Sequence, residues 1–99
     1  MDVIANDLAK FEQDITDYDG SFTRLDRAQL QLLAHMNELQ NMWEGEAHDQ
    51  FMETFSKDYQ KVVNMVDFLK EVLSDLNFAD KEYTSCESSV ESIIESMDV

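Results

Sequence analysis

The stretch NMWEGEA, residues 41–47, places the only tryptophan of the chain two positions before one of its two glycines, near the middle of 99 residues. Gly45 can adopt the positive φ that ends a helix. Long segments with helical hydrophobic periodicity lie on both sides of this stretch, and the chain contains no proline. We therefore expect a turn at residues 43–45 between two long helices.

The first half of the chain carries an apolar stripe whose members follow one another at alternating spacings of four and three residues. Such a seven-residue repeat is typical of a long helix that packs in coiled-coil fashion. The stripe keeps its phase across Gly20, which favours one continuous or bent helix over a break at this glycine. Its expected core members are Phe11, Ile15, Tyr18, Phe22, Leu25, Leu32, Met36 and Leu39.

The second half repeats the pattern, and Asp80 and Glu87 interrupt it. Its expected core members are Phe51, Phe55, Tyr59, Val62, Val66, Leu69, Leu73 and Leu76. The fold class is all-α: one helical-hairpin domain over residues 1–99, with helix one at about 3–42, the turn at 43–45, helix two at about 46–82 and a C-terminal signal tail at about 83–99. Flanking apolar residues make both stripes too wide for a single hairpin to cover. We expect the hairpin to dimerise into a four-helix bundle.

The charge balance limits the classes of partner. Twenty-two acidic and seven basic residues give a formal net charge of −15, which weighs against nucleic acids and anionic membrane surfaces. The sequence has no run of eighteen apolar residues, and its N-terminus has neither the basic region nor the apolar region of a signal peptide. We expect no membrane span and no cleavable Sec signal.

Residues with catalytic or metal-binding chemistry are few. His35 and His48 lack the preceding glutamate of a Glu-x-x-His metal motif, and we interpret both as surface or turn residues. Cys86 has acidic neighbours, which disfavour a reactive thiolate, and an intermolecular disulfide at this residue stays open. We expect no catalytic residue, cofactor or metal, and hence no enzyme.

Trp43 and Gly45 have two interpretations from physical chemistry alone: a capped turn with an aromatic plug, or a binding site. A Trp-X-Gly turn in the middle of about one hundred residues, between two amphipathic helices, resembles the WXG family of ESAT-like proteins exported by the type VII (ESX) pathway. A second motif of that family, Tyr-x-x-x-Asp/Glu followed by two apolar residues, is matched by YTSCESSVESII, residues 83–94. Its four positions are filled by Tyr83, Glu87, Val90 and Ile94.

Helical spacing places these four side chains within about 60° of one another, on one face. Glu87, Glu91 and Glu95 repel one another at i,i+4, and acidic side chains are unfavourable at a helix C-terminus. We therefore expect the free tail to be frayed and to become helical on a receptor that offers a basic group for Glu87. The alternative is a frayed acidic helix end with no binding role.

The resemblance implies a small, virulence-associated protein that is cytoplasmic before export and then secreted or cell-surface. It implies pairing with itself or with a paralogous WXG-type protein, recognition by the type VII secretion ATPase, and a turn that lies beside the tail of the partner. The runner-up function is a targeting partner or chaperone that carries a larger helical toxin to the same machinery. A third is an intracellular acidic coiled-coil adaptor. The choice between homodimer and heterodimer stays open.

Overall fold

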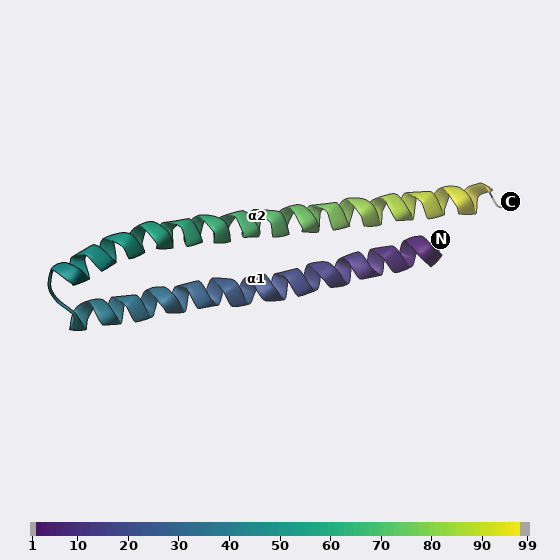
Figure 1. The fold of residues 1–99 in the computed structure, drawn as a ribbon. Helices are drawn as coiled ribbons and strands as arrows, with labels where there is room; N and C mark the ends of the chain where they lie inside the picture. The colour runs from purple at the N-terminus through teal and green to yellow at the C-terminus, as the bar shows by residue number, and fades with distance from the viewer. Residues whose placement is uncertain (1, 98–99) are drawn as a thin grey trace. The chain divides into compact units, whose positions relative to one another are not determined.

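Two long helices make up the chain. A computed structural model describes residues 2–97, apart from the side chains of Asp2 and Ile4. Helix α1 spans Asp2–Met42 and helix α2 spans Glu46–Met97, and residues 43–45 connect them (Figure 1). Residues 2–97 contain no strand. The predicted all-α helical hairpin is confirmed.

Helix α2 continues well past the boundary expected near residue 82. It includes Tyr83, Glu87, Val90 and Ile94 and ends at Met97, while residues 98 and 99 lie outside the described residues. No glycine or proline follows Gly45, and like-charge pairs at i,i+4 cost only about 0.2–0.5 kcal/mol each. This repulsion is too weak to end the helix, so the segment expected to be a frayed tail is the last part of α2.

Helix α1 passes through Gly20 without interruption. Among the described residues, only Gly45 has a positive φ. A glycine inside a helix costs about 1 kcal/mol relative to alanine, and the apolar repeat on both sides of Gly20 outweighs that cost. The continuous helix agrees with the preserved phase of the stripe.

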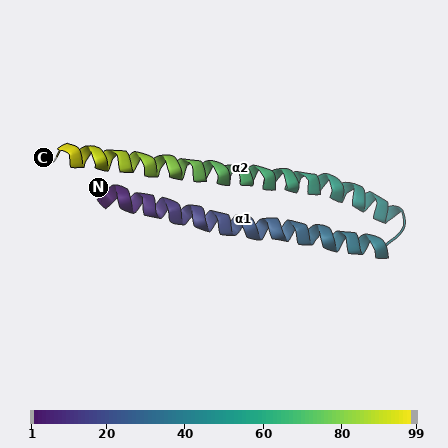
Figure 2. The same ribbon diagram turned by 180° about the vertical axis from the view of Figure 1, so that it is seen from behind.

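The chain divides into two compact units: residues 21–70, here called the turn unit, and residues 1–20 with 71–99, here called the terminal unit. Within each unit a segment of α1 runs antiparallel beside a segment of α2 (Figures 1 and 2). In the terminal unit the last turns of α2 extend beyond the first turn of α1 in both views. Both helices run through both units, and one domain over 1–99 stays a prediction.

Each unit has a small core. Leu8 and Ile15 are buried in the terminal unit, and Met36 and Val66 are buried in the turn unit. No described side chain falls below 2% exposure. The remaining stripe residues are half-buried at Phe11, Tyr18, Phe22, Leu25, Phe55, Tyr59, Val62, Leu69, Leu73 and Leu76, and exposed at Leu32, Leu39 and Phe51.

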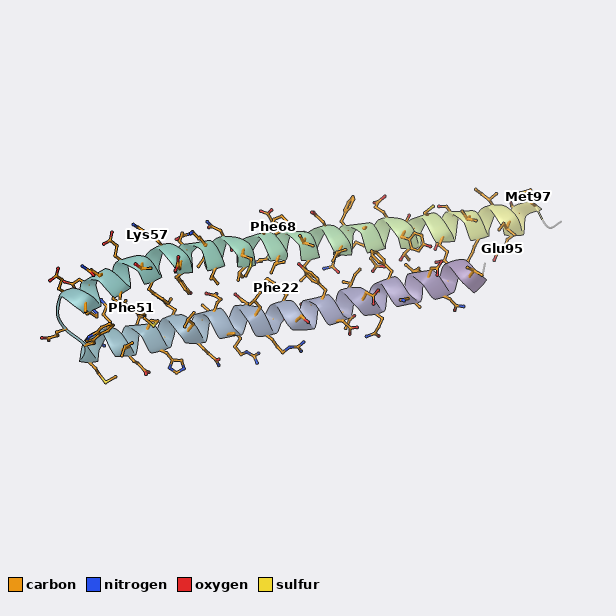
Figure 3. All side chains as sticks on the ribbon, viewed as in Figure 1. Phe22, Phe51, Lys57, Phe68, Glu95 and Met97 are labelled. Carbon is orange, nitrogen blue, oxygen red and sulfur yellow. The ribbon has the colours of Figure 1, made fainter. Side chains whose placement is uncertain are left out.

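Figure 3 shows why so little is buried in the turn unit. Phe22 lies between the two helices, whereas Lys57 and Phe68 point away from α1. Phe68 is 62% exposed. Two helices meet along one narrow line, so only the side chains on that line can lose most of their contact with water.

Candidate functional site

The connection between the helices depends on Gly45. Its φ is +112°, a value that L side chains rarely adopt, and a Cβ added to it would meet no atom within 4 Å. The backbone N–H of Asp49 donates a 3.1 Å hydrogen bond to the carbonyl oxygen of Gly45. This bond is the first i→i−4 bond of α2. Gly45 therefore caps the start of α2 from the connection, whereas we expected its positive φ to end the preceding helix.

The first turn of α2 is acidic, with Glu46 and Asp49. Carboxylates near a helix N-terminus interact favourably with the unsatisfied N–H groups and the helix dipole. Neither helix has a basic residue in its last turn. Interactions between side-chain charges and the helix dipole therefore stabilise the start of α2 and do not stabilise the end of either helix.

Trp43 begins an aromatic ladder, which we define as Trp43, Phe51, Phe55 and Tyr59. The rings of Trp43 and Phe51 are 5.5 Å apart and tilted by 53°. Phe51 stacks on Phe55 at 6.4 Å, and Phe55 stacks on Tyr59 at 5.6 Å. Contacts of this kind contribute about 0.5–1.5 kcal/mol beyond area burial. The half-buried Trp43 is thus joined to α2 through side chains repeated every four residues.

His48 packs against the same tryptophan. Its ring meets Trp43 edge-on at 5.3 Å, and only 12% of its side chain is exposed. Nδ1 lies 3.1 Å from Oδ1 of Asp49, while the buried Nε2 has no hydrogen-bond partner among the described residues. We expected a surface or turn residue, and His48 lies in the first turn of α2 with most of its side chain shielded from solvent. Its position three residues before Phe51 places it on the face of the ladder, and this spacing was the signal in the sequence.

The ladder ends in a polar contact with α1. The hydroxyl of Tyr59 donates a hydrogen bond to the side-chain oxygen Oε1 of Gln29, and the backbone carbonyl oxygen of Gln29 lies 3.4 Å from the same hydroxyl. Gln29 is the polar residue that interrupts the apolar stripe of α1. The interruption therefore has a partner on the facing helix, and the pair disfavours other registers of α1 against α2.

The four residues of the expected signal all lie on the last part of α2. Tyr83 is 37% exposed, Val90 and Ile94 are also exposed, and Glu87 is half-buried. Ile93 and Met97 add exposed apolar surface at the same end, which Figure 3 marks by Glu95 and Met97. Their spacing on a continuous helix places the four expected residues on one face.

A groove of about 390 Å³ lies in the terminal unit. It is lined by Asp7 and Phe11 of α1 and by Ala79 and Tyr83 of α2. Asp80, which follows Ala79, is half-buried, and its Oδ1 is shielded from solvent with no hydrogen-bond partner among the described residues. The sequence marked Asp80 as an interruption of the stripe but did not indicate the groove or the shielding of this carboxylate.

Other expected features are placed as follows. His35 is exposed and lies 4.0 Å from Glu38, and the free thiol of Cys86 is also exposed. Among residues 2–97, no group of three or more His, Cys, Asp or Glu is arranged to hold a metal ion. No helix in the described part of the chain is long and apolar enough to cross a membrane.

Two amphipathic helices joined by a Trp-X-Gly turn define a small helical-hairpin protein that presents apolar residues to its surroundings. Residues 3–88 match the family model WXG100, described as proteins of 100 residues with WXG, so the chain belongs to this family. The matched range includes Trp43, Gly45, Tyr83 and Glu87 and stops before Val90 and Ile94. No curated protein and no solved structure matches the chain.

Family membership confirms the resemblance seen in the sequence and makes the chain a small protein associated with type VII secretion. Proteins of this family are secreted by the type VII pathway, pair as homodimers or heterodimers, and are not typically enzymes.

Proposed function

We propose that this protein is a type VII secretion substrate that acts through protein–protein contacts as a dimer. Its export signal combines the Trp43 turn with Tyr83 and Glu87 on α2. The observation that carries the proposal is the match to the WXG100 family over residues 3–88, which spans the turn and these two residues of α2. Secretion leaves the protein in the medium or at the cell surface, after a cytoplasmic stage.

The support for a dimer is the apolar surface that one chain leaves uncovered. Only four described side chains are buried, while Leu32, Leu39, Phe51 and Met65 remain exposed in the turn unit. A second hairpin, either an identical copy or a paralogous chain, would cover this surface and complete a four-helix bundle. Sedimentation equilibrium on the purified protein tests this, and a stable monomer at all concentrations would contradict it.

The support for recognition by the secretion ATPase is the face of α2 that carries the second motif. Tyr83, Val90 and Ile94 are exposed side chains on one helical face, with the carboxylate of Glu87 among them. A groove with one basic group would fit this surface. Glu87→Gln should weaken binding to the purified ATPase by about 1–3 kcal/mol, because a desolvated charge pair would be lost.

The export experiment compares culture medium from cells with and without the secretion ATPase. The parent should reach the medium only when the ATPase is present. The double variant Trp43→Ala with Gly45→Ala should stay in the cells while remaining helical by circular dichroism. Glu82→Gln is the matched control for Glu87→Gln, because Glu82 is an exposed acid on the same helix outside the motif. Export without the ATPase, or unfolding of the double variant, would refute the proposed signal.

A second candidate function is a targeting partner that pairs with a larger helical toxin and carries it to the same ATPase. The observation in its favour is Asp80, whose shielded Oδ1 has no hydrogen-bond partner among the described residues and would be satisfied by a donor from a different chain. Co-expression with a candidate toxin separates the two functions, since only a targeting partner is required for export of the toxin.

A further inference from the structure

The two units differ sharply in charge. The terminal unit, residues 1–20 and 71–99, contains 14 of the 22 acidic residues and 2 of the 7 basic residues, for a net charge of −12. The turn unit, residues 21–70, contains the other 8 acidic and 5 basic residues, for a net charge of −3. Most of the charge of the chain is therefore concentrated on the unit that carries both chain ends.

Both segments of the terminal unit carry this charge. Residues 1–20 contain 6 of its acidic residues, and residues 71–99 contain the other 8. Packing the two segments side by side brings like charges together, and such self-repulsion destabilises a compact state. The Debye length is about 30 Å at 0.01 M salt and about 3 Å at 1 M salt. The repulsion therefore acts across the whole unit only at low ionic strength.

Asp80 adds a second cost to the packing of these segments. It lies two heptads after the buried Val66, at the same position of the repeat, and so belongs to the side of α2 that packs on α1. Its Oδ1 is shielded from solvent and has no hydrogen-bond partner among the described residues. A shielded carboxylate without a donor is unfavourable, and separation of the two segments would return it to water.

The apolar contacts that oppose this separation are few in the terminal unit. Among its described side chains, only Leu8 and Ile15 are buried. A groove of about 390 Å³ remains between the two segments, lined by Asp7, Phe11, Ala79 and Tyr83. Side chains along an open groove lose the dispersion contacts that a filled core would give them.

The turn unit holds its two helices together in three further ways. Residues 43–45 connect the helices directly, the aromatic ladder packs along its part of α2, and the hydroxyl of Tyr59 donates a hydrogen bond to Gln29 of the facing helix. Its lower net charge also reduces the repulsion between the helices. The two units should therefore respond differently to ionic strength.

We propose that the terminal unit is a charge-gated clamp. At low ionic strength residues 7–20 of α1 and residues 71–86 of α2 separate while the turn unit stays paired, and the shielded carboxylate of Asp80 favours the open state. Salt screens the repulsion and closes the clamp. Opening exposes Leu8, Ile15 and the side of residues 71–86 that packs on α1. This conformational device goes beyond the proposed function and does not rest on export.

Hydrogen–deuterium exchange of the full-length protein, read by mass spectrometry at one chain concentration, tests the clamp. Most helical stability in proteins comes from packing, so a separated segment loses protection of its amides. Peptides from residues 71–86 should exchange at least about tenfold faster at 0.01 M than at 1 M salt, and peptides from residues 46–70 should change by less than about threefold. The urea-unfolded protein, measured at each salt concentration, corrects for direct effects of salt on exchange.

Two variants decide whether Asp80 favours the open state. Asp80→Asn should slow the exchange of residues 71–86 at low salt by at least about threefold, because it removes the shielded charge. Asp75→Asn removes the same charge at an exposed position of α2 and should slow it by less than about twofold. Asp80→Leu, which removes both oxygens, should slow the exchange further and serves if asparagine alters the fold. All variants should match the circular dichroism spectrum of the parent at high salt.

Two results would overturn the proposal. If residues 71–86 and 46–70 respond equally to salt, the charge of the terminal unit does not open it separately. If the variants at Asp80 and Asp75 slow exchange equally, the shielding of Asp80 does not favour the open state. The assay needs no secretion system, so export can fail with the clamp intact, and the clamp can fail with export intact.

Discussion

Replacing Gly45 by alanine should destabilise the protein through its backbone alone. The φ of +112° is strained for an L residue, at about 1–3 kcal/mol. No steric cost is added, because a Cβ at this position would meet nothing within 4 Å. Alanine also lowers the entropy of the unfolded chain, which stabilises by about 0.4–1 kcal/mol. The net expectation for Gly45→Ala is a loss of about 1–2 kcal/mol in the free energy of unfolding.

The matched control is D-alanine at position 45, introduced by chemical synthesis of the chain. A D residue favours positive φ, so this variant keeps the entropic gain and avoids the strain. It should be more stable than the parent by about 0.4–1 kcal/mol. L-alanine and D-alanine contain the same atoms, and their expected effects on the free energy of unfolding have opposite signs. The comparison therefore isolates the effect of the positive φ just before α2.

Urea unfolding followed by circular dichroism measures both effects, at one chain concentration because a dimer makes stability depend on concentration. If the L-alanine and D-alanine variants unfold at the same urea concentration, the positive φ does not decide the stability of the turn. If both are destabilised equally, a side chain at this position is harmful for some other reason. Either result would refute the reasoning.

Further variants at Tyr59, Val66 and His48, with controls, test the turn unit by urea unfolding. Tyr59→Phe should lose about 1 kcal/mol by removing the donor to Gln29. Adding Gln29→Leu should recover only part of that loss, because it removes the unpaired Oε1 but also the 3.1 Å hydrogen bond from Nε2 of Gln29 to Oδ1 of Asp26. Val66→Ala should lose about 1–3 kcal/mol because Val66 is 5% exposed, whereas Val3→Ala, at a residue 71% exposed, should change stability by less than about 0.5 kcal/mol. His48→Phe should be at least as stable as the parent because it removes the unpartnered Nε2 and keeps an aromatic ring.

Hydrophobic periodicity in the sequence predicted most of the fold. The stripe that crosses Gly20 without a change of phase indicated one helix, and α1 is continuous there. The absence of proline left the stretch around Gly45 as the one clear break, and residues 43–45 form the connection. These features depend on local chain geometry, which the order of residues largely determines.

The end of α2 and the role of Gly45 were predicted less well. The repulsion among Glu87, Glu91 and Glu95 suggested a frayed tail. Helix α2 contains no glycine or proline, and this repulsion is too weak to end it before Met97. Gly45 was expected to end the first helix because glycine can adopt a positive φ, while the hydrogen bond from Asp49 shows that it caps the start of α2. A positive φ serves either role, so residue type alone does not distinguish them.

The sequence by itself determined the two helices, the place of the turn, the membership of each apolar stripe and the family. Only the tertiary structure decided which members of a stripe are buried, that His48 packs against Trp43, that Tyr59 meets Gln29, and that Oδ1 of Asp80 is shielded without a donor among the described residues. The physical reason is that periodicity specifies which residues share a face of a helix. Which residues a helix face contacts depends on the rotation of the facing helix about its axis and on its shift along that axis. Contacts between side chains distant in the sequence determine both.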